Sequence, residues 1–413
     1  MFFIYQTIIL IIIFFSPVII IYRIIKNKED KKRFKEKFCF FSKKKTGKKL
    51  VWFHGSSVGE LMSIIPIINY YEKNNHFDQI LITSSTLSSS KILQKFNFKK
   101  VIHQFYPIDF VFFSKKFLNY WKPNLIIFLE SEIWPSMFLK IKKKKLPLIL
   151  LNARISKSTF QRWNKVKKFS KSVFDNIHYA YPQNKETKIF LQKLGLKKIK
   201  FLGNLKFIEN KDDKQDKMNR TLYKELKNRK IFVAASTHNR EEIFAAQTHI
   251  LLKKKDKKTL TVIIPRHVDR TKDISGEIEK LNLKIAYHSL KRQNLRNIDI
   301  YIVDTFGESK KFYKLAKRVF LGGSIVNKGG QNPLEPARYG AKIFHGPYID
   351  NFRDVYDFLG QMKVSKKILK PVEIVNSSIN KDNTTKISKI KNLGNKIFIN
   401  TVKELDKIIH NEF

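Results

Sequence analysis

The stretch Leu50-Val51-Trp52-Phe53-His54-Gly55-Ser56-Ser57-Val58-Gly59-Glu60 decides the fold. Its apolar start predicts a buried strand, its small residues predict a turn, and residues 61–68 carry the apolar spacing of a helix. Strand, turn and helix in this order build open α/β sheets, whose ligands bind beyond the carboxyl ends of the strands. We therefore expect Glu60, one turn into the helix, to lie over the end of the strand.

The turn before Glu60 has more than one interpretation. Glycines and backbone N–H groups at a helix start suit a phosphate, but the Gly-x-Gly-x-x-Gly and Walker spacings are both missing. The carboxylate of Glu60 is then the group of interest. It is either a catalytic group or a first-turn acid that complements the helix dipole, and the segment alone leaves both readings open.

Composition limits the class of protein. A chain of 413 residues is long enough for two domains with buried cores. Its 82 Lys and Arg against 35 Asp and Glu give a formal net charge of +47, which suits nucleic acid, an anionic membrane or anionic substrates as partners. The lysines are scattered over most predicted helix faces, so we expect most of them to be solvated. A nucleic-acid-binding protein would carry a basic stripe with interleaved aromatics, which this chain lacks, so no specific nucleic-acid partner is expected. The single cysteine, Cys39, excludes an intramolecular disulfide and favours a reducing compartment.

The N-terminal segment is almost wholly apolar from Phe2 to Ile25, long enough to cross or deeply enter a bilayer. A cleavable signal peptide would carry its positive charge before the apolar run, whereas here a basic run follows it. That order predicts a membrane anchor with the rest of the chain in the cytoplasm, at the inner membrane, and attraction to anionic membrane lipids. Ser16-Pro17 in the middle leaves both a single span and a one-leaflet anchor open.

Two cycles of strand and helix follow, which predicts two doubly wound, Rossmann-like parallel α/β domains that face each other across a cleft. The strands expected in the first cycle are 50–54, 79–84, 101–106, 124–130, 146–152, 178–181 and 199–201. Those expected in the second are 231–236, 261–265, 283–286, 300–303, 318–321 and 342–344. The predicted domains are a membrane anchor (1–26), a basic juxtamembrane segment (27–48), an N-terminal domain (49–208), a linker (209–229), a C-terminal domain (230–374) and a helical tail (375–413).

Polar residues at strand ends in the first cycle are candidates for chemistry. Glu130 and Glu132 precede Pro135, which favours a helix start, so either acid could cap that helix instead. Arg154 follows the next strand and is either an anion ligand or the partner of one of these acids. Lys206 adds one ammonium group at the end of the domain.

The second cycle offers a nucleotide site. Polar residues end three of its strands, and a loop with two glycine pairs lets backbone approach a ligand closely before Asn332-Pro333 opens a helix. The start of that helix suits a phosphate, and Glu335 can accept two ribose hydroxyls. His54, His238 and His267 are expected to donate hydrogen bonds to a phosphate or a sugar. The sequence carries no metal-binding signature, so no metal and no cofactor are expected.

Taken together, these motifs strongly resemble those of the 3-deoxy-D-manno-octulosonic acid (Kdo) transferases, membrane-associated glycosyltransferases of the GT-B fold. The segments that carry the resemblance, from the basic run 33–41 nearly to the C-terminus, are 52–60, 130–135, 152–156, 203–207, 236–238, 265–267, 304–308, 322–335 and 346–352. This chain departs from the family at Phe306, Cys39 and Ser131, where methionine, glycine and threonine are usual, and at Tyr348. The corner at 55–60 beside 130–135 distinguishes this family from other GT-B proteins such as sugar-nucleotide epimerases.

The resemblance implies inverting, metal-independent transfer of Kdo from CMP-Kdo to lipid IVA, the lipid A precursor. It implies that Glu60 is the proton acceptor and that Glu130 and Lys206 stabilise the transition state. The CMP-binding residues that it implies are Arg266, His267, Phe306, Gly307, Glu308, Asn332, Pro333, Leu334 and Glu335. Further candidates for substrate binding are Ser236, Thr237, His238, Gly323, Ser324 and Arg154.

Overall fold

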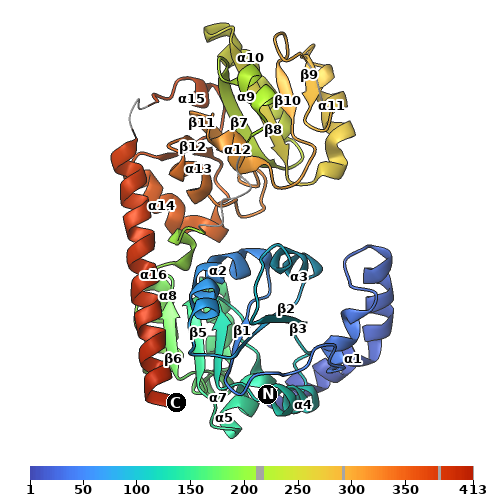
Figure 1. Cartoon of the computed structure of the whole chain (residues 1–413), viewed down its shortest axis with the longest axis vertical. Helices are drawn as coiled ribbons and strands as arrows, with labels where there is room; N and C mark the ends of the chain where they lie inside the picture. Colours follow the sequence, from blue (N-terminus) through green and yellow to red (C-terminus); the bar gives the residue numbers. More distant parts are fainter. Residues whose placement is uncertain (211–217, 291–293, 380–382, 413) are drawn as a thin grey trace. The chain divides into compact units, whose positions relative to one another are not determined.

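The computed structural model describes residues 1–210, 218–290, 294–379 and 383–412. The chain divides into two compact units, unit 1 (Met1–Lys211 with Leu393–Phe413) and unit 2 (Asp212–Asn392). Each unit is built on a parallel sheet surrounded by helices (Figure 1), so the prediction of two Rossmann-like domains is confirmed. Of the predicted linker 209–229, residues 211–217 lie outside the described residues; α9 (Arg220–Leu226) follows them.

The described part of unit 1 contains a six-stranded sheet in the order β3-β2-β1-β4-β5-β6. Its strands are β1 (Leu50–His54), β2 (Gln79–Ser84), β3 (Val101–Phe105), β4 (Leu125–Leu129), β5 (Leu148–Ala153) and β6 (Tyr179–Pro182). The strand expected at 199–201 is wrong, because only Ile199 forms an isolated bridge to Ala180. The strand order reverses between β1 and β4, and such a reversal opens the crevice in which doubly wound sheets bind ligands.

Helices cover both faces of this sheet. They are α2 (Val58–Lys73), α3 (Leu87–Leu93), α4 (Val111–Trp121), α5 (Pro135–Lys143), α6 (Lys157–Lys165), α7 (Lys167–Phe174), α8 (Lys185–Lys193) and α16 (Thr384–Glu412), which begins in unit 2 and continues into unit 1. Alternate strand residues such as Trp52 and Phe128 join Phe117 of α4 and Phe138 of α5 in one buried cluster. On the other face, Tyr71 of α2 donates a hydrogen bond to Asp406 of α16 over 2.9 Å.

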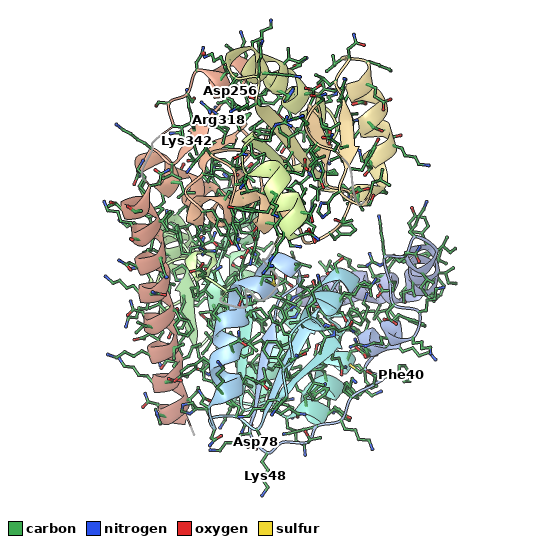
Figure 2. All side chains as sticks on the ribbon, turned by 45° about the horizontal axis from the view of Figure 1, so that its top comes forward. Phe40, Lys48, Asp78, Asp256, Arg318 and Lys342 are labelled. Atoms are coloured by element: carbon green, nitrogen blue, oxygen red, sulfur yellow. The ribbon has the colours of Figure 1, made fainter. Side chains whose placement is uncertain are left out.

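Side chains also fix where the chain enters the sheet. Asp78, just before β2, accepts the backbone N–H groups of Lys48 and Lys49, each over 2.9 Å (Figure 2). The short helix η1 (Arg33–Phe38) is held in the same way, because the buried carboxylate of Glu36 accepts the N–H of Phe105 over 2.8 Å. The segment 27–48, which was predicted to lie beside the membrane, is therefore bound to the sheet rather than free of it.

The helix α1 (Phe2–Ile25) is long and apolar enough to cross a membrane, by length and composition. One stripe of it is less exposed than the residues between, and the stripe consists of Phe2, Tyr5, Gln6, Ile9, Ile13, Ser16 and Ile20. This spacing is that of one helix face. The first turns of the helix contact α5 and α7 through Gln6 and Phe2, and apolar side chains along the rest of its length are exposed.

The described part of unit 2 contains a seven-stranded parallel sheet in the order β13-β12-β11-β7-β8-β10-β9. Its strands are β7 (Lys230–Thr237), β8 (Thr259–Pro265), β9 (Ile285–Tyr287), β10 (Ile300–Ile302), β11 (Arg318–Leu321), β12 (Lys342–His345) and β13 (Ser365–Lys367). Its helices, besides α9, are α10 (Glu241–Lys255), α11 (Thr271–Glu279), α12 (Ser309–Tyr313), α13 (Leu334–Arg338), α14 (Arg353–Gln361) and α15 (Pro371–Val375). Strand β13 was not predicted. The order reverses between β7 and β11, and Arg318 of β11 stands opposite Lys342 of β12 in register (Figure 2).

Candidate active site

In unit 1, acidic side chains gather where the strand order reverses. Glu60 follows β1 and Glu130 follows β4, and these two strands are neighbours in the sheet. The carboxyl ends of adjacent parallel strands lie at the same edge of a sheet, so the fold brings the two acids together. Glu60 consequently lies within range of the negative charges of Glu132 and Glu130, both of which act on its pKa.

Glu60 is held by the turn that precedes it. The N–H of Ser56 donates to Oε2 over 2.7 Å and the Ser57 hydroxyl donates to Oε1 over 2.8 Å, while the Ser57 oxygen also caps the N–H of Glu60 over 3.3 Å. Burial, and then the negative charges of Glu132 and Glu130, raise the pKa of Glu60 from 4.5 to about 7, against the opposing effect of the two serine hydrogen bonds. A carboxyl poised near neutral pH suits proton transfer better than a helix-dipole role.

Glu130 forms a buried ion pair with the predicted lysine. Lys206 Nζ lies 2.9 Å from Glu130 Oε1, and both side chains are about nine-tenths buried. Glu130 has a φ of 49°, a left-handed conformation that is uncommon for such a residue, so the surrounding structure has to hold it. Asn152 supplies part of that support, because its Nδ2 approaches Glu130 Oε1 at 3.4 Å and its Oδ1 accepts the N–H of Leu205 over 2.9 Å.

Glu132 ends a chain of hydrogen bonds that crosses the core. Trp52 donates to Thr83 Oγ1 over 2.8 Å, and Thr83 Oγ1 lies 2.9 Å from His54 Nδ1. His54 Nε2 then lies 3.1 Å from Glu132 Oε2, which also accepts the Trp134 indole N–H over 2.9 Å. Because His54 is fully buried and both of its nitrogens are engaged, the expectation that it donates to a ligand is wrong.

The expectation that Glu130 or Glu132 caps the following helix is also wrong. The helix α5 begins at Pro135, and its first N–H groups are bound by Asp109, whose carboxylate accepts those of Ser136 and Met137, each over 2.9 Å. Sequence reasoning missed Asp109, because it lies 27 residues before Ser136 and no local pattern marks it. Both acids before Pro135 are consequently left for other roles. The half-buried Arg154 follows β5, and its backbone N–H donates to the Glu130 carbonyl over 3.2 Å.

In unit 2, the glycine-rich loop after β11 is organised by an acid that sequence reasoning missed. The fully buried Glu241 opens α10, and its Oε2 accepts the N–H groups of His238 over 2.9 Å and Gly323 over 2.7 Å. Its Oε1 accepts those of Ser324 over 3.1 Å and Ile325 over 2.9 Å. A Cβ at Gly322 would lie 2.4 Å from the Ser236 carbonyl oxygen, so only glycine allows this approach. The amides of residues 323–325, in the loop where backbone was expected to approach a ligand, are thus bound by Glu241.

Cationic and imidazole side chains surround the same loop. His238 follows β7 and His267 follows β8, with ring centroids 5.8 Å apart, and the N–H of Arg266 donates to the buried Thr237 over 3.0 Å. Burial lowers the pKa of His238 below 6.5; Glu241 opposes this effect, and the nearby positive charges of His267, Lys328 and Arg266 add to it. His238 is therefore neutral at pH 7 and sits in a positive environment suited to an anion.

The remaining predicted residues lie near two short helices, α12 and α13, which pack together. Glu308 precedes α12 and pairs with Lys311 at 2.7 Å and His288 at 3.5 Å. Phe306 is 76% exposed and Gly307 has a φ of 88°. Asn332 Oδ1 accepts the N–H of Leu334 over 3.0 Å, with Pro333 at the N-cap and the half-buried Glu335 in the first turn of α13.

The predicted site residues thus form two groups. Glu60, Glu130, Lys206 and Arg154 gather at the switch point of unit 1, and the predicted CMP-binding residues lie at strand ends of unit 2. Within the described residues, no three His, Cys, Asp or Glu side chains are placed to hold a metal ion.

Comparisons with known proteins bear on both groups. A family model described as 3-deoxy-D-manno-octulosonic-acid transferase (kdotransferase) matches residues 32–209. The 3-deoxy-D-manno-octulosonic acid transferase of Rickettsia bellii is 34% identical over 356 residues, which cover 86% of this chain and 84% of that protein. The transferase of the same name from Haemophilus influenzae is 28% identical over 319 residues, with 76% of this chain and 74% of that protein covered.

Solved structures agree on the fold. The crystal structure of UDP-GlcNAc 2-epimerase from Neisseria meningitidis bound to UDP-GlcNAc aligns with a TM-score of 0.56 and 12% identity, covering 88% of this chain and 100% of that one. A likeness at this identity shows the GT-B type of fold and nothing about the substrate.

Proposed function

This chain belongs to the 3-deoxy-D-manno-octulosonic acid (Kdo) transferase family, and on that premise we propose that it transfers Kdo from CMP-Kdo to lipid IVA with inversion at the anomeric carbon. The chain is a glycosyltransferase, and Kdo transfer in lipopolysaccharide biosynthesis is its activity. The donor, the acceptor and the residue roles are the parts that we propose. The donor and the acceptor follow from membership of the family, and the observation that carries the residue roles is the Glu60 carboxyl at the switch point of unit 1, held by Ser56 and Ser57 with a pKa raised to about 7.

In the proposed reaction, a hydroxyl oxygen of the acceptor attacks the anomeric carbon of Kdo. The bond from that carbon to the phosphate oxygen breaks, and CMP leaves with the bonding electrons. The hydroxyl proton passes to a carboxylate oxygen of Glu60, which Ser56 and Ser57 hold in place. A positioned general base of this kind accelerates a reaction by about 10²- to 10⁴-fold.

Glu130 and Lys206 act together in this proposal. The transition state of glycosyl transfer resembles an oxocarbenium ion, so a neighbouring carboxylate favours its positive charge. Lys206 holds the Glu130 side chain in its buried position through the 2.9 Å contact, and its ammonium group favours the negative charge of the departing phosphate.

Unit 2 is proposed to hold the donor. Because Glu241 occupies the amides of the loop at 323–325, the phosphate of CMP is assigned to side chains, namely Arg266, His267 and Lys328. Arg266 and Lys328 are exposed and His238 beside them is half-buried, so this positive group is accessible. The ribose and base are assigned to 306–308 and 332–335.

We also propose that the chain is attached to the cytoplasmic side of the inner membrane through α1. The exposed face of the helix is apolar over its length, with Phe3 81%, Phe14 79% and Val18 69% exposed. Since the first turns of α1 are bound to α5 and α7, a position within one leaflet fits better than a free span.

The test uses the full-length chain purified in detergent. It is incubated with CMP-Kdo and lipid IVA, with a chelator of divalent metals present, and the lipid products are resolved by mass. We expect a lipid heavier by one or more Kdo residues together with released CMP. A chain that leaves lipid IVA unchanged under these conditions contradicts the proposed substrates.

Two variants separate the role of Glu60 from general effects. Glu60→Gln keeps the shape and the hydrogen-bond acceptor, and we expect a loss of about 10²- to 10⁴-fold in rate with the fold intact. Glu186→Gln makes the same change at an exposed first-turn acid of α8 and is expected to be fully active. Equal activity of the two variants would remove the assignment of Glu60 as base.

A further inference from the structure

The first turns of α1 are joined to unit 1 by specific contacts. The Tyr5 hydroxyl donates to Asp109 Oδ2 over 2.7 Å, and Gln6 Nε2 donates to Ser136 Oγ over 2.7 Å. The rings of Phe2 and Tyr5 each lie 6.5 Å from the ring of Phe169 in α7. This end of the helix is therefore held against α5 and α7, and its position relative to unit 1 is fixed.

A cavity of about 300 Å³ lies where α1 meets α6 and α7. Ile4 and Ile8 of α1 form one wall, and Trp163, Val166 and Phe169 form the other. The volume is at the lower end of the range for small-molecule pockets, and the side chains of both walls are apolar. Such a lining favours a hydrocarbon and gives a polar ligand few partners.

Among the side chains that line the cavity, that of Arg162 is charged, and Met1 beside it adds its α-amino group. The Arg162 side chain is exposed, and its Nε approaches the Ser158 carbonyl of the same helix at 3.5 Å. No acidic side chain of residues 1–210, 218–290, 294–379 or 383–412 pairs with it. An apolar hollow with an unpaired guanidinium at its rim is complementary to an anionic amphiphile, because a guanidinium binds phosphate oxygens in pairs.

The walls also connect the cavity to the surface that would meet a bilayer. Ile4 is 53% exposed and Ile8 is 51% exposed, so both residues line the cavity and belong to the outer face of α1. A lipid that lies beside α1 in the membrane can therefore enter the cavity without passing through water.

We propose that this cavity binds one acyl chain of an anionic bilayer phospholipid, with the lipid phosphate beside Arg162. The proposal rests on the proposed membrane attachment through α1 and commits to a lipid of the bilayer rather than to the acceptor. Occupancy would fill the space between α1 and α6–α7 and so hold the anchor against unit 1. The site lies among residues that the proposed reaction does not use.

The experiment uses the full-length chain bound to phosphatidylcholine vesicles that contain a phosphatidylglycerol with a photoreactive diazirine at the end of one acyl chain. After irradiation, the labelled peptides are mapped by mass spectrometry, and the label is expressed per molecule of vesicle-bound protein. We expect label within 163–169, and less label there when the probe is a phosphatidylcholine.

Two pairs of variants test the walls and the rim. Ile8→Trp fills the cavity with a larger side chain, so that a bound acyl chain would be overpacked. A penalty of the usual size lowers the affinity for the lipid, and with it the label at 163–169, by about tenfold. Ile11→Trp, on the exposed face outside the cavity, is expected to leave that label unchanged. Arg162→Glu should abolish the preference for the anionic probe, whereas Lys168→Glu makes the same charge change on α7 outside the cavity and should keep it.

Each contrary outcome overturns a defined part of the reasoning. If the chain binds vesicles but the label is confined to the exposed face of α1, the lipid site is contradicted and the membrane attachment is not. The same conclusion follows if Ile8→Trp and the unaltered chain carry equal label at 163–169. Displacement of the probe by stoichiometric lipid IVA would assign the cavity to the acceptor instead. A chain that does not bind vesicles removes both the attachment and the site, whereas failed Kdo transfer with intact labelling removes only the proposed reaction.

Discussion

The raised pKa of Glu60 leads to a prediction about a neighbouring acid that is not itself the base. Glu132 is the largest electrostatic contributor to that shift after burial. Glu132→Gln removes its negative charge but keeps an oxygen that can accept from the indole of Trp134 and the imidazole of His54, which now lie 2.9 and 3.1 Å from the carboxylate. We therefore expect a lower pKa of Glu60 in a site that keeps its shape.

The size of the effect follows from the ionised fraction of Glu60. With a pKa of about 7, about one tenth of the carboxyl is ionised at pH 6. Removing a like charge that contributes about one pKa unit, a typical size for a nearby charge, would leave the variant about half ionised at pH 6. If Glu60 is the base, kcat/KM at pH 6 rises about fivefold and the value at pH 9 stays unchanged.

The assay is the dependence of kcat/KM on pH between about 5.5 and 9, with released CMP as the readout. The unaltered chain should lose activity tenfold per pH unit below about pH 7, and the curve of Glu132→Gln should be displaced towards acid. Glu186→Gln serves as the control for the loss of one negative charge at an exposed position. Superimposable curves for Glu132→Gln and the unaltered chain would refute the reasoning, because the charge would then not act on the catalytic group.

Three further predictions concern stability. The folded-state pKa of Glu60 lies above its ordinary value of 4.5, so its contribution to stability is fully present below pH 4.5 and is lost as pH rises through about 7. Glu60→Gln should therefore raise the free energy of unfolding by up to about 3 kcal/mol at pH 8.5 and leave it unchanged at pH 4.5. The measurement is the Tm of both proteins, which should be higher for the variant only at the higher pH. Lys206→Met leaves the Glu130 carboxylate buried without its partner and should lower the unfolding free energy of unit 1 by about 3–5 kcal/mol in denaturant titrations, while adding Glu130→Gln should recover much of the loss. Glu241→Ala leaves several buried N–H groups without an acceptor and should destabilise unit 2 by about 3 kcal/mol or more, with faster amide exchange at 323–325; unchanged exchange there would contradict its role.

The fold was largely predictable because its strands are apolar runs separated by helical spacing. The two exceptions are short segments that lie at the edge of a sheet. β13 (Ser365–Lys367) has three residues, two of them exposed lysines, and lies at the edge of its sheet, so no apolar pattern marks it. At 199–201 the alternation of Lys198 and Lys200 with apolar residues imitates an edge strand, but the chain pairs only at Ile199.

The candidate site was predictable where motif and topology agree, as for Glu60 and Glu130 after two neighbouring strands. It was not predictable where a distant residue supplies a hydrogen bond. Asp109 binds N–H groups 27 and 28 residues away, and Glu241 binds those of residues 82–84 positions away. Capping rules compare residues within a turn or two of each other, so neither acid could be assigned from sequence.

Glu241 also changes the physical argument for anion binding in unit 2. A glycine-rich loop beside a helix start usually offers its amides to a phosphate, but here a buried carboxylate already accepts the amides of Gly323, Ser324 and Ile325. A phosphate at the same place would meet a negative charge instead of free donors. In the proposed site, binding of a nucleoside monophosphate would then depend on positive side chains outside the loop, and Arg266 and Lys328 lie near His238 in that position. If these side chains bind the phosphate as we propose, the site should release its anionic product readily once the bond to the sugar is broken, because long charged side chains return to solvent at little cost.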